Sequence, residues 1–162
     1  MGGKGAPEKF IVKGKRLDGR KLDEIRDIEI QAGVIPNANG SCRLKIGCTE
    51  VLVSVYGPRA VIPKHKTIGD RAYLNCYYDM ASFATTERNR PGPSRRSKEI
   101  SMVMKSALAP SIMLEKYPKT EIDVYAIISN ANAGTRCAAI SAAAVALADA
   151  GIEMRDIVAS VA

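Results

Sequence analysis

The first half of the chain alternates between apolar and polar residues, as half-buried strands do. Residues 25–34 (IRDIEIQAGV) and 42–48 (CRLKIGC) both follow this alternation. Residues 51–57 (VLVSVYG) are nearly continuous in apolar and β-branched side chains, and predict a more central strand that ends at Pro58. Together the three segments predict an antiparallel meander.

Turns and loops separate these predicted strands. The stretch 38–41 (ANGS) predicts a hairpin turn with Asn-Gly at its tip, and Thr49-Glu50 predicts a second tight turn. Residues 58–70 hold two prolines and predict a loop. Residues 81–97 predict a long loop with four arginines, and loops of that length are often functional.

The second half mixes strand and helix patterns. Residues 72–80 (AYLNCYYDM) and 120–129 (TEIDVYAIIS) have strand character. Between them a helix is predicted to begin near Ser94 or Ser97, and Pro110 is expected to open a second short helix. The apolar face of the first helix would comprise Ile100, Val103, Met104, Ala107 and Leu108.

The stretch 130–151 (NANAGTRCAAISAAAVALADAG) is dominated by alanine. It predicts a buried helix that reaches about Ala150 and is ended by Gly151 in a left-handed conformation. Residues 156–162 (DIVASVA) are expected to begin another strand. Because strands come early and helices later, the predicted fold class is α+β.

The length of 162 residues suits one domain, assigned here to residues 16–162 and preceded by a flexible tail at 1–15. Lys and Arg total 24 against 17 Asp and Glu, giving a net charge of +7. A balance of this sign points to an anionic partner, most commonly nucleic acid. A basic surface that serves only solubility is the alternative.

Cysteine and histidine content argues against a zinc site, because no CxxC pair is present and His65 is the only histidine. Cys42, Cys76 and Cys137 lie among apolar or strand-like neighbours, which favours reduced thiols and a cytoplasmic location. The N-terminus shows no apolar signal segment, and the apolar-rich run 137–150 is too short to span a membrane. No membrane partner is expected.

Gly134, Thr135 and Arg136 stand at the start of the alanine-rich helix. A helix N-terminus offers unpaired N–H groups and partial positive charge, glycine permits close approach, and the hydroxyl and guanidinium add donors. The triplet therefore forms a candidate phosphate or carboxylate site. The alternative is that Thr135 caps the helix and Arg136 is a solvated surface residue.

Two further basic clusters are candidates for RNA contact. Arg95 and Arg96 stand at the other predicted helix start and could hold successive phosphates, although a charged loop is the alternative. Lys64, His65 and Lys66 lie in a proline-bounded loop and fit contacts to an RNA backbone or a plain exposed loop equally well.

No nucleophile–base pair stands out. Ser54, Ser101 and Ser141 fall in predicted strand or helix interiors, with no histidine at motif spacing. The predicted chemistry is therefore phosphate-based, with phosphate itself as a possible attacking group.

Linked motifs over residues 16–162 resemble the RNase PH family. Within that family the chain is most similar to the catalytic-type subunit of the archaeal exosome ring. The motifs are RLDGRKLDEIR, NANGSCRLKIGCTEVLVSVYGPR, PSRRSKEIS, ANAGTRCAAISAAAVALADAG and MRDIVAS.

The resemblance implies an RNase PH-like α+β fold of the ribosomal protein S5 domain 2 type. It also implies 3′-to-5′ phosphorolysis of single-stranded RNA, in which inorganic phosphate is the co-substrate and nucleoside diphosphates are released. Mg²⁺ is expected. The implied assembly is a hexameric ring that alternates with a homologous inactive subunit and carries RNA-binding cap subunits.

Carried over by motif, Arg96, Gly134, Thr135 and Arg136 would bind phosphate. Arg95 and Arg96 would bind RNA near its 3′ end, and Lys64 and His65 would touch RNA at the channel entrance.

The chain departs from the family pattern at two points. Asn132 stands where the family usually has aspartate. The acidic catalytic residue of the family is expected beyond Ala162, so this chain resembles the N-terminal two-thirds of a domain, inactive by itself: a fragment, a trimmed version or a truncated gene product. A non-catalytic RNA-binding or structural ring subunit and a homohexameric tRNA 3′-trimming enzyme are the alternative functions.

Overall fold

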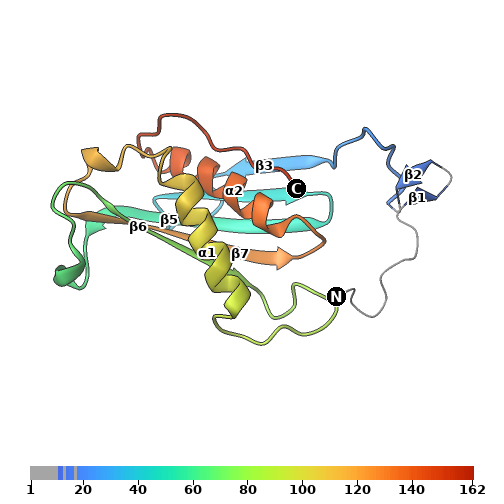
Figure 1. The fold of residues 1–162 in the computed structure, drawn as a ribbon, viewed down its shortest axis with the longest axis horizontal. Helices are drawn as coiled ribbons and strands as arrows, with labels where there is room; N and C mark the ends of the chain where they lie inside the picture. Colours follow the sequence, from blue (N-terminus) through green and yellow to red (C-terminus); the bar gives the residue numbers. More distant parts are fainter. Residues whose placement is uncertain (1–10, 13, 17) are drawn as a thin grey trace.

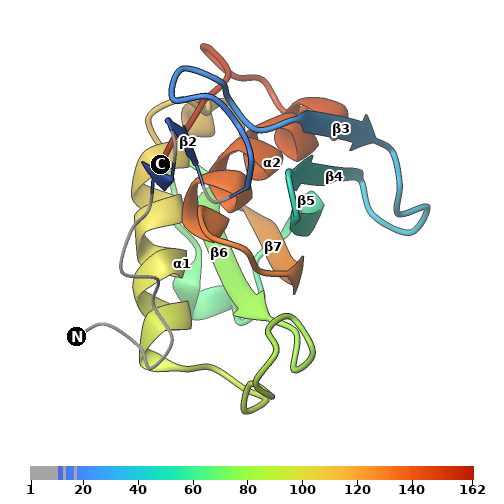
Figure 2. The same cartoon turned by 90° about the vertical axis from the view of Figure 1, so that its right-hand side faces the viewer.

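The computed structural model describes residues 11, 12, 14–16 and 18–162. Two helices lie on one face of a five-stranded sheet whose strand order is β3-β4-β5-β7-β6 (Figures 1 and 2). Most of the predicted 1–15 tail lies outside the described residues. Its described part contributes the short antiparallel pair of β1 (Ile11–Val12) and β2 (Lys15–Arg16).

The predicted meander is confirmed. It consists of β3 (Ile28–Ala32), β4 (Gly40–Ile46) and β5 (Thr49–Ala60), each antiparallel to the next. Alternate residues of β4 and β5 are buried toward the helices, as the alternation along the sequence requires.

Both predicted turns are displaced along the chain. Residues 33–39 connect β3 to β4, so Gly40 lies inside β4, opposite Val55, and not at a turn tip. Its role is close packing, because a Cβ there would lie 2.3 Å from the backbone nitrogen of Ala150. The second turn is Gly47-Cys48, where the positive φ of 58° suits glycine.

The prediction that Pro58 ends its strand is wrong. β5 continues to Ala60, and the register against β7 shifts between Tyr56 and Arg59. A proline lacks the N–H that a regular ladder needs, and the irregularity accommodates it.

The remaining strands are confirmed as β6 (Tyr73–Met80) and β7 (Thr120–Asn130), which pair in parallel. The loop before β6 contains a short 3₁₀ helix, η1 (Lys64–Lys66). One parallel pair among antiparallel ones agrees with the α+β class. The segment between β6 and β7 carries α1 (Arg95–Leu108), which covers part of the sheet (Figure 1).

The two helices begin as predicted, but Pro110 opens no helix. It lies in the turn that follows α1, and the next helical turn is η2 (Leu114–Lys116). α2 (Thr135–Asp149) is followed by Gly151 with a φ of 69°, which confirms the predicted left-handed terminus.

The strand predicted for residues 156–162 is also wrong, since this segment has no regular structure. It runs along α2 and does not join the sheet. The Ser160 N–H donates to the Ser141 hydroxyl at 3.0 Å, and that hydroxyl donates to the Ser160 carbonyl at 3.3 Å. The alanine-rich helix is thus covered by the sheet, by α1 and by this segment, as an all-apolar helix requires.

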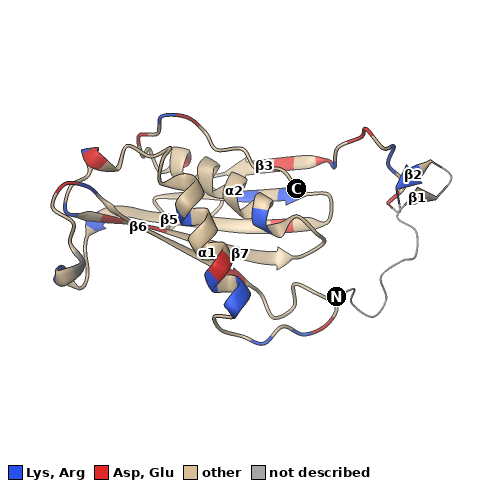
Figure 3. Ribbon diagram, in the orientation of Figure 1, with Lys and Arg blue, Asp and Glu red and all other residues tan. Residues whose placement is uncertain are grey.

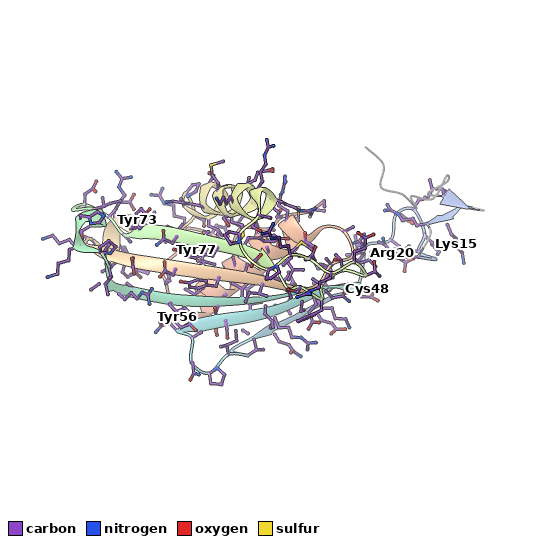
Figure 4. All side chains as sticks on the ribbon, turned by 90° about the horizontal axis from the view of Figure 1, so that it is seen from below. Lys15, Arg20, Cys48, Tyr56, Tyr73 and Tyr77 are labelled. Atoms are coloured by element: carbon purple, nitrogen blue, oxygen red, sulfur yellow. The ribbon has the colours of Figure 1, made fainter. Side chains whose placement is uncertain are left out.

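In the described part of the chain, no helix covers the second face of the sheet. Tyr77 stacks on Tyr125 with ring centroids 4.7 Å apart, and Tyr56 meets Tyr125 edge to face. Tyr56 and Tyr77 are labelled in Figure 4. The four cysteines are free thiols, and burial raises the pKa of Cys42 to about 11 and of Cys76 to about 12. Among the described residues, no helix combines the length and hydropathy needed to cross a membrane.

Gly40→Ala should destabilise the fold by about 3 kcal/mol. The added Cβ would clash with backbone atoms of Ala146 and Ala150, and helix backbone cannot move aside as a flexible side chain could. Gly69→Ala is the matched control, since its Cβ would meet no atom within 4 Å and its φ is not positive. The control should change the free energy of unfolding by less than about 0.5 kcal/mol. Denaturant titration measures both, and equal values would contradict the packing role of Gly40.

Candidate functional site

The start of α2 is shaped by two consecutive left-handed residues. Ala133 has a φ of 63° and Gly134, the N-cap, has a φ of 72°. The alternative in which Thr135 caps the helix is therefore wrong, because Thr135 is the first residue of the helix itself. A glycine N-cap contributes no side-chain acceptor, so its first-turn N–H groups are left for other partners.

A cavity of about 570 Å³ lies at this helix start. It brings together the first turn of α1, the first turn of α2 and the end of β6. Its lining residues are Met80, Thr85, Arg96, Ala131, Ala133, Gly134, Thr135, Arg136, Cys137 and Ala162. Arginines are the charged residues in this described lining, and no carboxylate is among them, which makes the cavity suited to anions.

Arg96 reaches the cavity from a well-capped helix. Ser94 accepts from the Ser97 N–H at 3.0 Å, and the Ser97 side chain reaches back to the Ser94 N–H. This reciprocal capping fixes Arg95 and Arg96 as the first two residues of α1. Both are exposed, but Arg95 does not line the cavity.

Arg136 extends from the first turn of α2 toward α1. Its guanidinium donates to the Glu99 carboxylate at 3.0 Å, and both side chains are about half exposed. Arg136 is therefore an exposed surface residue, as the alternative expected, but it is paired with Glu99. Basic residues mark the starts of both helices in Figure 3, and this ion pair joins them.

The loop before α2 is held by hydrogen bonds to Thr49 of β5. The buried Thr49 hydroxyl donates to the Ala133 carbonyl at 2.8 Å and accepts from the Asn132 N–H at 3.0 Å. The Arg26 guanidinium donates to the Asn132 and Ala133 carbonyls at 3.1 and 3.3 Å. These bonds hold the left-handed residues in place.

Tyr78 of β6 supports the helix start from the core. Its hydroxyl donates to the Thr135 hydroxyl oxygen at 3.0 Å, and both side chains are buried. Burial raises the pKa of Tyr78, opposed by the hydrogen bond to Thr135 and by the charge of Arg96. The phenol therefore stays protonated at neutral pH.

The structure separates Lys64 and His65 from this cavity. They are exposed in η1, which follows β5 at the end where Ala60 pairs with Thr120. The cavity lies beyond the opposite end of β7, since part of its lining directly follows Asn130, the last residue of that strand. Figure 1 shows the start of α2 at this end of β7. With eleven residues, β7 is about 35 Å long. Within one chain, the two predicted RNA contacts therefore do not meet.

A second hollow of about 670 Å³ lies between α1, β6 and β7. Its lining is mostly apolar and aromatic, including Tyr77 and Tyr125. It holds Asp79 and Lys98 but no pair of arginines, so it lacks the anion-binding character of the smaller cavity.

The expected Mg²⁺ stays a prediction. Magnesium in proteins is held by carboxylates and phosphate oxygens. In the part of the chain that the structure describes, no three His, Cys, Asp or Glu side chains gather as metal ligands.

Sequence reasoning missed Arg26, Thr49, Tyr78 and Glu99. Each of the four forms a hydrogen bond with a residue in the 132–136 segment, and the two partners are at least 37 residues apart in the sequence. No local motif links such distant positions, and only the strand order brings them together.

Comparison with known sequences gives a consistent family. The sequence model described as "3' exoribonuclease family, domain 1" matches residues 24–153. The exosome complex component Rrp41 of Methanopyrus kandleri is 55% identical over 157 residues, covering 96% of this chain and 66% of the relative. Rrp41 of Pyrococcus abyssi is 52% identical, covering 92% of this chain and 60% of the relative. The chain thus spans less than two-thirds of the length of these relatives.

Solved structures share the fold. Rice Rrp46 superposes with a TM-score of 0.77 at 25% identity, over 88% of this chain and 64% of that one. A chain of the Archaeoglobus fulgidus exosome with RNA bound to the active site gives a TM-score of 0.70 at 27% identity, over 82% of this chain and 55% of that one.

Thr49→Val should lower the free energy of unfolding by about 1–3 kcal/mol, because it leaves the Asn132 N–H and the Ala133 carbonyl without their partner. Thr49→Ser keeps the hydroxyl and should cost less than the valine variant. Chemical denaturation of both variants measures the difference. Equal or greater stability of the valine variant would contradict the role assigned to the hydroxyl.

Proposed function

Because the chain belongs to the 3′ exoribonuclease family, we propose that its cavity binds the inorganic phosphate that attacks RNA. The whole protein would act as a 3′-to-5′ phosphorolytic exoribonuclease subunit of an exosome core ring. The observation that carries this proposal is the convergence of Arg96, Arg136 and the uncapped start of α2 on one cavity without carboxylates in its described lining. The Rrp41 relatives and the RNA-bound Archaeoglobus exosome support it.

The proposed reaction brings two anions together. A phosphate oxygen attacks the phosphorus of the terminal phosphodiester, and the bond from that phosphorus to the 3′ oxygen of the preceding nucleotide breaks. The products are a nucleoside diphosphate and an RNA one nucleotide shorter, whose 3′ oxygen takes up a proton. Arg96, Arg136 and the N–H groups of α2 would neutralise the charge that accumulates as the phosphates meet.

These residues supply binding and charge, not proton transfer. None of the described residues that line the cavity has a carboxyl group on its side chain. We therefore assign proton transfer to the acidic residue that the family resemblance places beyond Ala162. The cavity would hold the attacking phosphate in place, and the acidic residue would complete the site.

RNA contacts are proposed at two separate places. Arg95 and Arg96 would bind the backbone next to the attacked phosphodiester, and Lys64 and His65 would bind it upstream. The length of β7 separates the two places. This separation fits a single strand that runs along the subunit and meets the cavity only at its 3′ end.

Further expectations concern partners and cofactors. We propose that a homologous inactive subunit alternates with this one in a hexamer, that RNA-binding cap subunits sit on the ring, and that the complex is cytoplasmic. Mg²⁺ is left out of the mechanism, because the described residues offer no ligand cluster for it.

The second candidate is a ring subunit that binds RNA without catalysis, and the cavity's lack of a carboxylate in its described lining favours it. A homohexameric tRNA 3′-trimming enzyme is the third. It would assemble into a ring without any partner subunit, which size measurement of the purified protein detects.

The full-length protein, assembled with its ring partner and given Mg²⁺, inorganic phosphate and poly(A), should release nucleoside diphosphates. Arg136→Ala should lower kcat/KM for phosphate about a hundredfold, because a fixed cation is lost where charge accumulates. Arg155→Ala is the matched control. Arg155 is exposed beyond the other end of α2 and should leave the rate unchanged.

Chromatography of the products and initial rates at varied phosphate concentration measure these effects. Release of nucleoside monophosphates without added phosphate would identify hydrolysis and overturn the proposal. Unchanged degradation by the Arg136→Ala ring would favour the non-catalytic alternative.

A further inference from the structure

The contact between Tyr78 and Thr135 joins the core of the domain to the anion cavity. Tyr78 is 3% exposed and lies between the sheet and the helices. Thr135 is 5% exposed, yet it lines the cavity at the first turn of α2. Their hydroxyl oxygens are 3.0 Å apart.

The direction of this hydrogen bond determines what Thr135 can do. A threonine hydroxyl has one proton to donate and two lone pairs that accept. A phenol is more acidic than an aliphatic alcohol, so Tyr78 donates and Thr135 accepts. The single proton of the Thr135 hydroxyl is thereby left for a different acceptor.

The phenol is kept in its donating form. Burial raises the pKa of Tyr78, and the positive charges of Arg96 and Arg136 only partly oppose this shift. The same two arginines line the cavity, which places the phenol within their field. Below the ordinary pKa of a tyrosine the hydroxyl is therefore protonated.

We propose that Tyr78 is a positioning residue that fixes the Thr135 hydroxyl as a hydrogen-bond donor to phosphate in the cavity. This inference rests on the proposed function, because it takes inorganic phosphate as the ligand. Without the phenol, the Thr135 hydroxyl is no longer held in one orientation and can donate to a backbone carbonyl of the loop before α2 instead.

The test uses the full-length protein assembled with its ring partner. Tyr78→Phe removes one oxygen and should raise KM for phosphate about fivefold, with KM for RNA unchanged and kcat changed less than twofold. Thr135→Val removes the donor itself and should raise KM for phosphate at least as much. Tyr77→Phe is the matched control, because Tyr77 is the next residue of β6 and lies on the opposite face.

A double-mutant cycle separates positioning from a merely structural effect. In the Thr135→Val background, Tyr78→Phe should cause no further rise in KM for phosphate, because the hydroxyl it orients is gone. In the Thr135→Ser background the effect of Tyr78→Phe should persist. Two results would overturn the inference. One is a further rise in KM for phosphate when Tyr78→Phe is added to Thr135→Val, and the other is an unchanged KM for phosphate in Tyr78→Phe alone.

Calorimetric titration with inorganic phosphate keeps this test distinct from that of the proposed function. If the wild-type ring releases no nucleoside diphosphates and still binds phosphate, the proposed function fails. The same double-mutant cycle, measured on the dissociation constant of phosphate, then still tests the role of Tyr78. If wild-type protein binds no phosphate, both fail. Thermal unfolding of each variant identifies any that has lost its fold, and for a Tyr78→Phe variant that has, the cycle is repeated with Tyr78→His, which restores a donor.

Discussion

The close contact between α2 and the sheet is the constraint on which the candidate site depends. Gly40 lets the backbone of β4 approach Ala146 and Ala150 to a distance at which no side chain fits. The Ser41 N–H donates to the Asp149 carboxylate at 2.9 Å and fastens the same end of the helix. Small side chains along α2 continue this close packing toward Thr135. A helix that is fixed along its length presents its first turn at a fixed place, as a binding site on a rigid element requires.

At the other end of α2 the same rigidity is supplied by hydrogen bonds. Thr49 and Arg26 hold the loop that contains Asn132 and Ala133. Ala133 adopts a positive φ, which is unfavourable for a residue with a Cβ and persists only where its surroundings hold it. The conformation that leaves the α2 N–H groups without a side-chain cap is therefore stabilised by Thr49 of β5 and by Arg26, and not by the loop itself. Anion binding then requires little reorganisation of the protein.

Local patterns in the sequence predicted most of the elements but placed their ends poorly. The apolar pattern located β3 to β7. Every second residue is buried along most of β6 and along β5 up to Gly57, whereas all five residues of β3 are exposed. Pro58 was misleading because a register shift absorbs it, and residues 156–162 were misleading because strand-like composition also suits a segment lying on a helix. Asn-Gly at 39–40 resembled a turn, whereas Gly40 serves packing. The residue types at both helix starts predicted an anion site, and the structure brings Arg96, Thr135 and Arg136 to one cavity. The bonds that hold this cavity depend on the strand order.

Two hydroxyl groups carry the strongest physical argument for the site. Thr49 and Tyr78 are buried, and at these positions valine and phenylalanine would fill nearly the same volume without a polar atom to satisfy. Both hydroxyls form hydrogen bonds, and all their partners lie within residues 132–135. Burying the two hydroxyls is unfavourable unless these hydrogen bonds form. The folded core therefore favours the conformation of residues 132–135 that supplies the partners, and that conformation in turn stabilises the core. The geometry of the cavity is therefore a property of the folded core, and not of the loop that lines it.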